Sequence, residues 1–295
     1  MNLLETATGM TTRLKKLIEG DRIVVAPGAF NAFSAKIIEK AGFPVVYLTG
    51  YGASADILGA PDFGLLTLTE MAEHAARMAQ AVNVPVIGDG DTGYGNAINV
   101  RRTVMEYERA GVAAIQLEDQ VSPKRCGHME GKEVIGAAEM VQKLRAAVDA
   151  RKDSDFLIIA RTDARAVLGL DEAIRRAKMY LDAGADVIFV EAPQSREELA
   201  RVAKEVKAPL MANMIEHGKT PLLTVKELED LGYKLVTFPL ATLYAAAKAV
   251  QDCVSELMRT GTTEGAIPNM LPFHEFNKLV GLPEYRDMEA KYRDK

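Results

Sequence analysis

The stretch QLEDQVSPKRCGHMEGK, residues 116–132, joins the end of an apolar run to a loop of reactive side chains. The small and apolar residues at 113–117 are typical of a buried strand, and Glu118 and Asp119 follow at its end. Beyond them, two bases, a thiol and an imidazole lie within five residues: Lys124, Arg125, Cys126 and His128. Titratable groups that cluster at a strand end favour a reactive site over a packed core.

The thiol of Cys126 is the most reactive group that this loop offers. The neighbouring cations of Lys124 and Arg125 favour its thiolate, which is the nucleophilic form of cysteine. The alternative is a solvated charged loop that contains an incidental cysteine.

Short strand-like runs rich in Val and Ile recur on both sides of this stretch. Because they do not alternate strictly between apolar and polar residues, they are typical of a parallel sheet that is buried on both faces. Eight such runs span residues 23–26, 45–49, 84–88, 113–117, 156–160, 186–190, 209–212 and 235–238.

Segments with apolar residues at three- and four-residue spacing separate these runs and predict helices. They cover residues 11–20, 32–40, 68–80, 97–109, 137–150, 170–183, 197–205 and 242–259. A glycine that would end a helix in the left-handed conformation precedes four of the strands, at Gly42, Gly111, Gly184 and Gly232. Eight strand–helix repeats predict an α/β fold, a (β/α)₈ TIM-type barrel rather than a doubly wound open sheet.

A single catalytic barrel domain is expected over residues 1–260, because no Pro/Ser/Gly-rich linker and no shift in composition interrupts it. The tail over residues 261–295 contains Phe273, Phe276, Leu279 and Tyr285, and it is too apolar for a free disordered end. We expect this C-terminal helical extension to pack on the barrel or on a neighbouring subunit.

Composition excludes several classes of protein. The net charge is −5 and no run of Lys and Arg interrupts this acidic balance, which argues against nucleic acid as a partner. The two cysteines imply no disulfide framework, so a reducing, cytoplasmic location is expected. The sequence has no signal-peptide pattern and no apolar run that would span a membrane.

A barrel of this kind carries its active site at the carboxyl ends of its strands. Many carboxylates gather there without a matching cluster of bases, and a hard divalent metal would offset their repulsion. Asp89 and Asp91 in GDGDTGYG lie two residues apart, so they would face the same side of an ideal strand. The alternative is a turn whose carboxylates cap the next helix. The expected strand ends supply Tyr47, Thr49, Gly50, Asp89, Asp91, Glu118, Arg161, Asp163, Glu191 and Asn213.

Six segments carry a resemblance to a known family. They are YLTGYGASADILGAPDFG (47–64), GDGDTGYGNAINVRRT (88–103), IQLEDQVSPKRCGHMEGK (115–132), ARTDA (160–164), VEAP (190–193) and ANMIEHGKTP (212–221). On these segments the chain resembles the isocitrate lyase / phosphoenolpyruvate mutase superfamily, and within it the small lyases that act on 2-methylisocitrate and 2,3-dimethylmalate. The resemblance covers about residues 10–260, and the KRCGH loop is its most specific element.

The resemblance implies a (β/α)₈ barrel that binds Mg²⁺ or Mn²⁺ and assembles as a homotetramer whose C-terminal helices are exchanged between subunits. It implies that Asp89 contacts the metal directly, and that Asp62, Asp91 and Glu118 hold metal-bound waters. Cys126 is expected on a mobile loop as the general acid, with Tyr47 near the metal and His128 either orienting Cys126 or capping the loop. Substrate binding is expected at Thr49, Gly50, Tyr51, Lys124, Gly127, Arg161, Glu191 and Asn213.

The function implied is a metal-dependent carbon–carbon lyase that cleaves a 2-hydroxy dicarboxylate to pyruvate and a short carboxylic acid. A substrate of the 2,3-dimethylmalate or 2-alkylmalate type is expected, because Tyr244 stands where the 2-methylisocitrate lyases carry an Arg for a third carboxylate. Lys219 is the residue that could replace this Arg. The alternatives are a 2-methylisocitrate lyase, a P–C bond enzyme such as a phosphoenolpyruvate or carboxyphosphonoenolpyruvate mutase, and a non-catalytic barrel.

Overall fold

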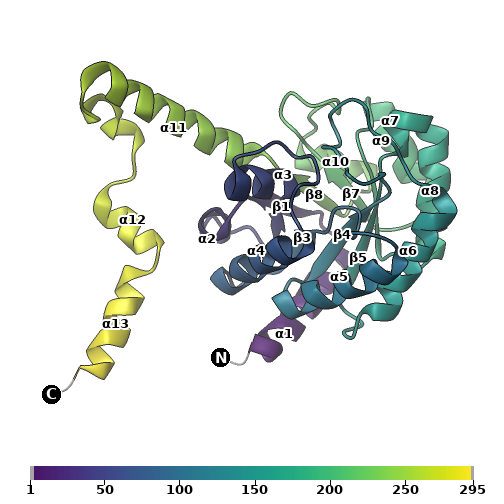
Figure 1. Ribbon diagram of the computed structural model, residues 1–295, viewed down its shortest axis with the longest axis horizontal. Helices are drawn as coiled ribbons and strands as arrows, with labels where there is room; N and C mark the ends of the chain where they lie inside the picture. Colours follow the sequence, from purple (N-terminus) through teal and green to yellow (C-terminus); the bar gives the residue numbers. More distant parts are fainter. Residues whose placement is uncertain (1–2, 294–295) are drawn as a thin grey trace. The chain divides into compact units, whose positions relative to one another are not determined.

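The eight strands of the computed structural model form a closed barrel in which all neighbours are parallel and follow the order of the sequence (Figure 1). The structure describes residues 3–293, with side chains from residue 9 onward. The strands are β1 Val24–Ala29, β2 Val46–Leu48, β3 Val86–Asp89, β4 Ala114–Glu118, β5 Leu157–Thr162, β6 Val187–Val190, β7 Leu210–Asn213 and β8 Leu235–Phe238. Strand β8 pairs with β1, Leu235 opposite Val24, so the barrel closes and the open-sheet alternative is excluded.

Helices separate the strands and surround the barrel. In the barrel unit they are α1 Leu3–Glu19, α2 Ala32–Lys40, α3 Gly50–Ala53, the π-helix η1 Ser54–Leu58, α4 Leu68–Ala81, α5 Ala97–Ala110, α6 Ala137–Ala150, α7 Ala164–Leu168, α8 Leu170–Asp182, α9 Arg196–Glu205 and α10 Val225–Leu231. The glycines predicted to end helices adopt the left-handed conformation, with φ of 92° at Gly42, 87° at Gly111, 101° at Gly184 and 98° at Gly232. The predicted strand–helix repeat is therefore confirmed.

The core consists of two apolar layers. In β5, Leu157 and Ile159 face the barrel interior, whereas Ile158 and Ala160 pack in the layer between the strands and the outer helices. Because both sides of each strand are buried, the strands read as continuous apolar runs. Leu14 of α1 packs into the interior layer and is fully buried, so α1 covers the amino-terminal end of the barrel and the site lies at the other end.

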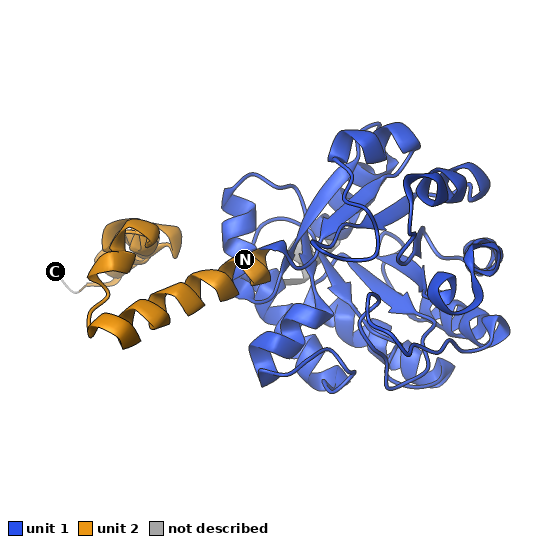
Figure 2. Cartoon of the chain, turned by 90° about the horizontal axis from the view of Figure 1, so that it is seen from above, with its two compact units in different colours: residues 1–241 blue, residues 242–295 orange. Residues whose placement is uncertain are grey.

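The chain divides into two compact units, residues 1–241 and 242–295 (Figure 2). The second unit contains nearly all of α11 Ala241–Thr260, followed by the 3₁₀ helix η2 Glu264–Asn269, α12 Phe273–Leu279 and α13 Leu282–Tyr292. Taken by itself, it exposes large apolar side chains such as Val254, Met258, Phe273 and Tyr285. That residues 261–295 pack on a neighbouring subunit stays a prediction. No helix among residues 3–293 is both long and apolar enough to cross a membrane.

Candidate active site

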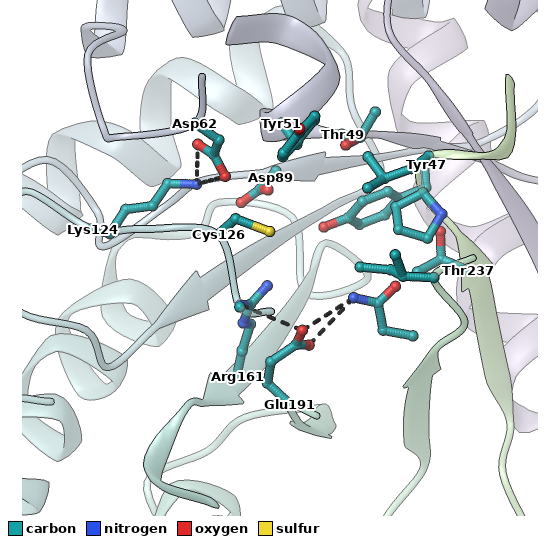
Figure 3. Close-up of a pocket in the computed structure, with 15 residues that line it drawn as sticks. Tyr47, Thr49, Tyr51, Asp62, Asp89, Lys124, Cys126, Arg161, Glu191 and Thr237 are labelled. Atoms are coloured by element: carbon teal, nitrogen blue, oxygen red, sulfur yellow. Dashed lines mark hydrogen bonds and ion pairs between the residues drawn. The ribbon is translucent and has the colours of Figure 1, made fainter. Parts of the chain in front are cut away.

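A pocket opens at the carboxyl ends of the strands, and Figure 3 shows the side chains that line it. Eleven of its lining residues are ones that the sequence pointed to: Tyr47, Thr49, Tyr51, Asp62, Asp89, Lys124, Cys126, Gly127, Arg161, Glu191 and Asn213. The remaining four are Ile215, Thr237, Pro239 and Leu240, which follow or end β7 and β8. Three of these four are apolar and follow the neighbouring strands β7 and β8, so they lack the polar side chains by which the other lining residues are predicted.

Asp89 is held in place at the end of β3. Its Oδ2 accepts a hydrogen bond of 3.1 Å from the backbone N–H of Gly50, and its Oδ1 accepts one of 3.1 Å from the N–H of Asp91. A Cβ atom at Gly50 would lie 2.7 Å from Oδ2 of Asp89 and 3.4 Å from Oδ1 of Asp91. Only glycine allows this approach, so Gly50 brings both carboxylates next to the start of α3.

Asp91 reaches the site through a turn rather than through strand alternation. Strand β3 ends at Asp89, and Asp91 has a φ of 47°, so the expectation that both residues extend from one strand face is wrong. The alternative of a helix cap is wrong too, because Asn96 caps α5 in a capping box with Asn99.

Lys124 offsets the negative charge of two carboxylates for which no basic partner is expected from the sequence. Its Nζ lies 2.7 Å from Oδ1 of Asp62 and 2.8 Å from Oδ1 of Asp91, and the side chain is almost fully buried. Burial alone would lower the pKa of Lys124, but Asp91 and Asp62 together raise this pKa well above its usual value. Burial raises the pKa of Asp91 to about 6 although Lys124 opposes the shift. The expectation that these carboxylates lack a compensating base is therefore wrong.

Asp62, Asp89, Asp91 and Glu118 surround Lys124 and form an acidic cluster, whose oxygens are the candidate donors to a divalent metal. Glu118 is buried, its Oε1 has no hydrogen-bond partner among the described residues, and burial raises its pKa well above the usual value. Among the described residues, no three acidic, His or Cys side chains converge closely enough to hold an ion directly. Mg²⁺ commonly takes one or two carboxylates and completes its shell with waters, so the oxygen donors present fit such a cation.

Arg161 occupies the carboxyl end of β5 among three carboxylates. Its Nε and Nη2 donate to Asp163 at 2.9 and 3.1 Å, and Nε also lies 3.4 Å from Oε2 of Glu118. Burial would raise the pKa of Asp163, but Arg161 and Lys132 lower it. Lys132 donates to Asp163 at 3.1 Å and to the carbonyl of Gly127, so it ties the Cys126 loop to Arg161.

Cys126 points its sulfur into the pocket (Figure 3). Burial raises the pKa of its thiol to about 11, although the backbone N–H of His128 acts in the opposite direction. The expectation that nearby cations favour the thiolate is wrong, because loss of solvation exceeds their effect. A thiol that stays protonated at neutral pH suits a proton donor better than a nucleophile.

The imidazole of His128 contacts two other segments of the chain. Its Nε2 lies 3.1 Å from Oε1 of Glu191, and its Nδ1 accepts a hydrogen bond of 2.8 Å from the backbone N–H of Lys219. Burial would raise the pKa of Glu191, but Arg161 and then His128 lower it to about 2. Asn213 donates to the same carboxylate at 3.3 Å, so Glu191 is held from three sides.

Tyr47 keeps its proton. Its hydroxyl donates to Oε1 of Gln116 at 3.0 Å, and burial followed by the charge of Asp89 raises its pKa well above the usual value. The side-chain amide nitrogen Nε2 of Gln116 in turn donates to Oδ1 of Asp89 at 3.5 Å. Sequence reasoning missed Gln116, although its position inside an otherwise apolar strand run was a usable signal.

Comparison with known proteins places this site in context. Residues 14–258 match the family described as phosphoenolpyruvate phosphomutase. The chain is 51% identical to the 2,3-dimethylmalate lyase of Eubacterium barkeri over 280 residues, which cover 95% of this chain and 97% of that protein. It is 49% identical to the 2-methylisocitrate lyase of Aeropyrum pernix, with 94% of this chain and 89% of that protein covered.

Two solved structures are informative. Oxaloacetate acetylhydrolase in complex with 3,3-difluorooxalacetate superposes with a TM-score of 0.93 at 35% identity, covering 98% of both chains. A phosphonopyruvate hydrolase solved in complex with oxalate and Mg²⁺ superposes with a TM-score of 0.87 at 32% identity, covering 96% of this chain and 99% of that one.

Proposed function

The chain belongs to the phosphoenolpyruvate phosphomutase family and is a carbon–carbon lyase; we propose that it cleaves a 2-hydroxy dicarboxylate of the 2,3-dimethylmalate or 2-alkylmalate type. The products would be pyruvate and a short carboxylic acid. The single observation that carries this proposal is the division of the pocket into a charged side and an apolar side.

The charged side offers few free positive charges. Lys124 and Arg161 are the cations among the described lining residues, so the pocket supplies one positive charge for each end of a dicarboxylate and none for a third carboxylate. Ile215, Pro239 and Leu240 line the apolar side. A dicarboxylate with alkyl substituents matches this division, because its methyl groups can lie against the apolar side.

A tricarboxylate matches the pocket less well. Lys219, the possible partner of a third carboxylate, pairs its ammonium with Glu130 and does not line the pocket. An unpaired carboxylate in a closed pocket costs several kcal/mol, roughly 2 to 5. The 2-methylisocitrate lyase reaction remains the second candidate because of the 49% identity to an enzyme of that name.

We also propose a divalent cation, Mg²⁺ or Mn²⁺, at the acidic cluster. Asp89 would contact it directly, whereas Asp62, Asp91 and Glu118 would hold its waters. When bound, the cation supplies Lewis-acid polarisation of the 2-hydroxy acid end of the substrate. The buried oxygen of Glu118 without a partner supports this proposal.

Arg161, Cys126 and Tyr47 have different roles in the proposed reaction. Arg161 binds a substrate carboxylate, and its fork fixes the orientation of the bond that breaks. Breaking that bond turns the 2-hydroxyl into the keto group of pyruvate, and the hydroxyl proton passes through water to a carboxylate of the acidic cluster. The electron pair of the broken bond moves onto the carbon next to the second carboxylate. The protonated Cys126 then gives its S–H proton to this carbon and becomes a thiolate. Tyr47, which keeps its own proton, positions the substrate rather than deprotonating it.

Steady-state kinetics with Mg²⁺ on two substrates test the proposal. We expect kcat/KM for 2,3-dimethylmalate to exceed that for 2-methylisocitrate at least tenfold. A higher kcat/KM for 2-methylisocitrate would overturn the assignment of substrate. Phosphonopyruvate serves as a third substrate, and turnover of it alone would instead identify a P–C bond enzyme.

A homotetramer is proposed as the working assembly. The second unit, residues 242–295, exposes apolar side chains on α11, α12 and α13, and an apolar surface of this kind normally packs against protein. Exchange of these helices between subunits would cover it.

A further inference from the structure

The ring of His128 contacts a tight turn at residues 215–219, about ninety residues further along the chain. In this turn the N–H of Gly218 donates to the carbonyl of Ile215 at 3.0 Å, and His217 adopts a left-handed φ of 60°. The turn thereby presents the N–H of Lys219 to Nδ1 of His128 at 2.8 Å. The loop that carries Cys126 is thus attached to the segment after β7.

The imidazole ring of His128 packs directly against the backbone of Gly218. A Cβ atom at this position would lie 2.6 Å from Nδ1 and 2.8 Å from Cε1 of His128. Its φ is not positive, so alanine is conformationally allowed there and the ring is the main obstacle. The carbonyl of Ile215, at 3.0 Å, is a tighter than usual neighbour that must shift slightly.

The two ring nitrogens of His128 have different tasks. Nδ1 accepts from a backbone N–H, so the proton of the neutral ring is on Nε2, which faces Glu191 at 3.1 Å. Glu191 and Asn213, which donates to it, both line the pocket. The ring of His128 therefore connects the turn at residues 215–219 to Glu191 in the pocket.

The pocket leaves little room for substrate when this contact is made. The free volume left for water is about 30 Å³, room for roughly two water molecules and too little for a dicarboxylate. Cys126 precedes His128 by two residues and lines the pocket, so movement of the loop away from the turn would enlarge the pocket.

We propose that Gly218 and the backbone N–H of Lys219 form a receptor for the His128 ring, and that this latch holds the Cys126 loop over the pocket. Gly218 is a positioning residue in this proposal, because it acts on Cys126 only through His128. The pocket is that of the proposed lyase, yet the latch can be tested without any turnover.

The experiment measures alkylation of Cys126 by iodoacetamide in the full-length protein, with peptide mass spectrometry to assign the modified thiol. Cys253 lies on α11 and serves as an internal reference in every sample. The variants are Gly218→Ala, His128→Ala and the double variant. Gly136→Ala is the matched control, because a Cβ atom there meets nothing within 4 Å.

We expect Gly218→Ala to speed alkylation of Cys126 at least tenfold while Cys253 and the Gly136→Ala control stay unchanged. His128→Ala should have a similar effect, and adding Gly218→Ala to it should change the rate less than twofold. An unchanged Cys126 rate in Gly218→Ala would overturn the latch, as would an equal acceleration by Gly218→Ala in the His128→Ala background. A general loosening of the barrel would lower its thermal midpoint relative to the Gly136→Ala control and would also count against it.

Discussion

The ammonium of Lys124 lies 2.8 Å from Oδ1 of Asp91, between that carboxylate and the one of Asp62. A positive side chain of the loop therefore occupies part of the space in which a metal with its waters would bind. Two cations in one acidic cluster repel each other, and burial weakens the screening between them.

Replacing Lys124 by methionine should therefore tighten binding of Mg²⁺ and Mn²⁺, by about tenfold, because it removes one positive charge from the cluster. Isothermal titration calorimetry of the substrate-free protein measures this affinity directly. Lys207→Met is the control, because Lys207 is an exposed lysine. Weaker or unchanged metal binding by the Lys124 variant would contradict the competition.

Removal of divalent metal should abolish turnover. Asp62, Asp89, Asp91 and Glu118 form an acidic cluster whose oxygen donors suit Mg²⁺. Pyruvate release should stop after exhaustive chelation and return when Mg²⁺ or Mn²⁺ is added. Full turnover by the chelated protein would refute a metal requirement.

Cys126→Ser should fold normally and lose most of its turnover, by roughly 100-fold or more, because a serine hydroxyl is a far weaker acid than a thiol. The thermal midpoint should stay within a few degrees, since the substitution is nearly isosteric. Cys253→Ser is the matched control and should keep wild-type kcat. A Cys126 variant with near wild-type kcat would exclude the general-acid role.

The alkylation rate of Cys126 should depend on pH in a distinctive way. Only the thiolate reacts, and burial raises the pKa of this thiol from 9.0 to about 11. The rate should therefore keep rising about tenfold per pH unit between pH 8 and 10, where an ordinary thiol begins to level off. Levelling off of the Cys126 rate near pH 9 would show that the thiol is not buried in solution.

Deletion of residues 261–295 should destabilise the oligomer, because it removes α12 and α13 with their exposed apolar side chains. Multi-angle light scattering of the truncated and full-length proteins measures the mass of each. A truncated chain that still forms a tetramer would refute the role of the tail.

The sequence was a reliable guide to the repeat and a weaker one to short elements. Residues 137–150 were predicted as a helix and form α6 with the same bounds, because their apolar spacing is long and regular. Helix α10, with only seven residues, was missed although Thr224 and Glu227 form its capping box. A helix of seven residues has only about two turns, which is too few for a periodic spacing of apolar residues to be recognised in the sequence.

The site was predictable as a set of residues but not as a set of interactions. Parallel strands place their carboxyl ends together, so the sequence alone groups Asp89, Glu118 and Arg161. The pairing of Lys124 with Asp62 joins residues 62 positions apart, and no local pattern signals it. The raised pKa of Cys126 depends on burial, which residue types alone do not reveal.

The two-layer packing of β5 has a consequence for how such a pocket can change over evolutionary time. Arg161 faces the pocket, whereas the next residue, Thr162, faces outward and donates to Asp119 at 2.7 Å. Inserting or deleting one residue in β5 would exchange these two positions and remove the guanidinium from the pocket in a single step. Diversification of substrate choice is therefore confined to replacing side chains on strands of fixed length. Changes in length are left to the loops beyond the strand ends.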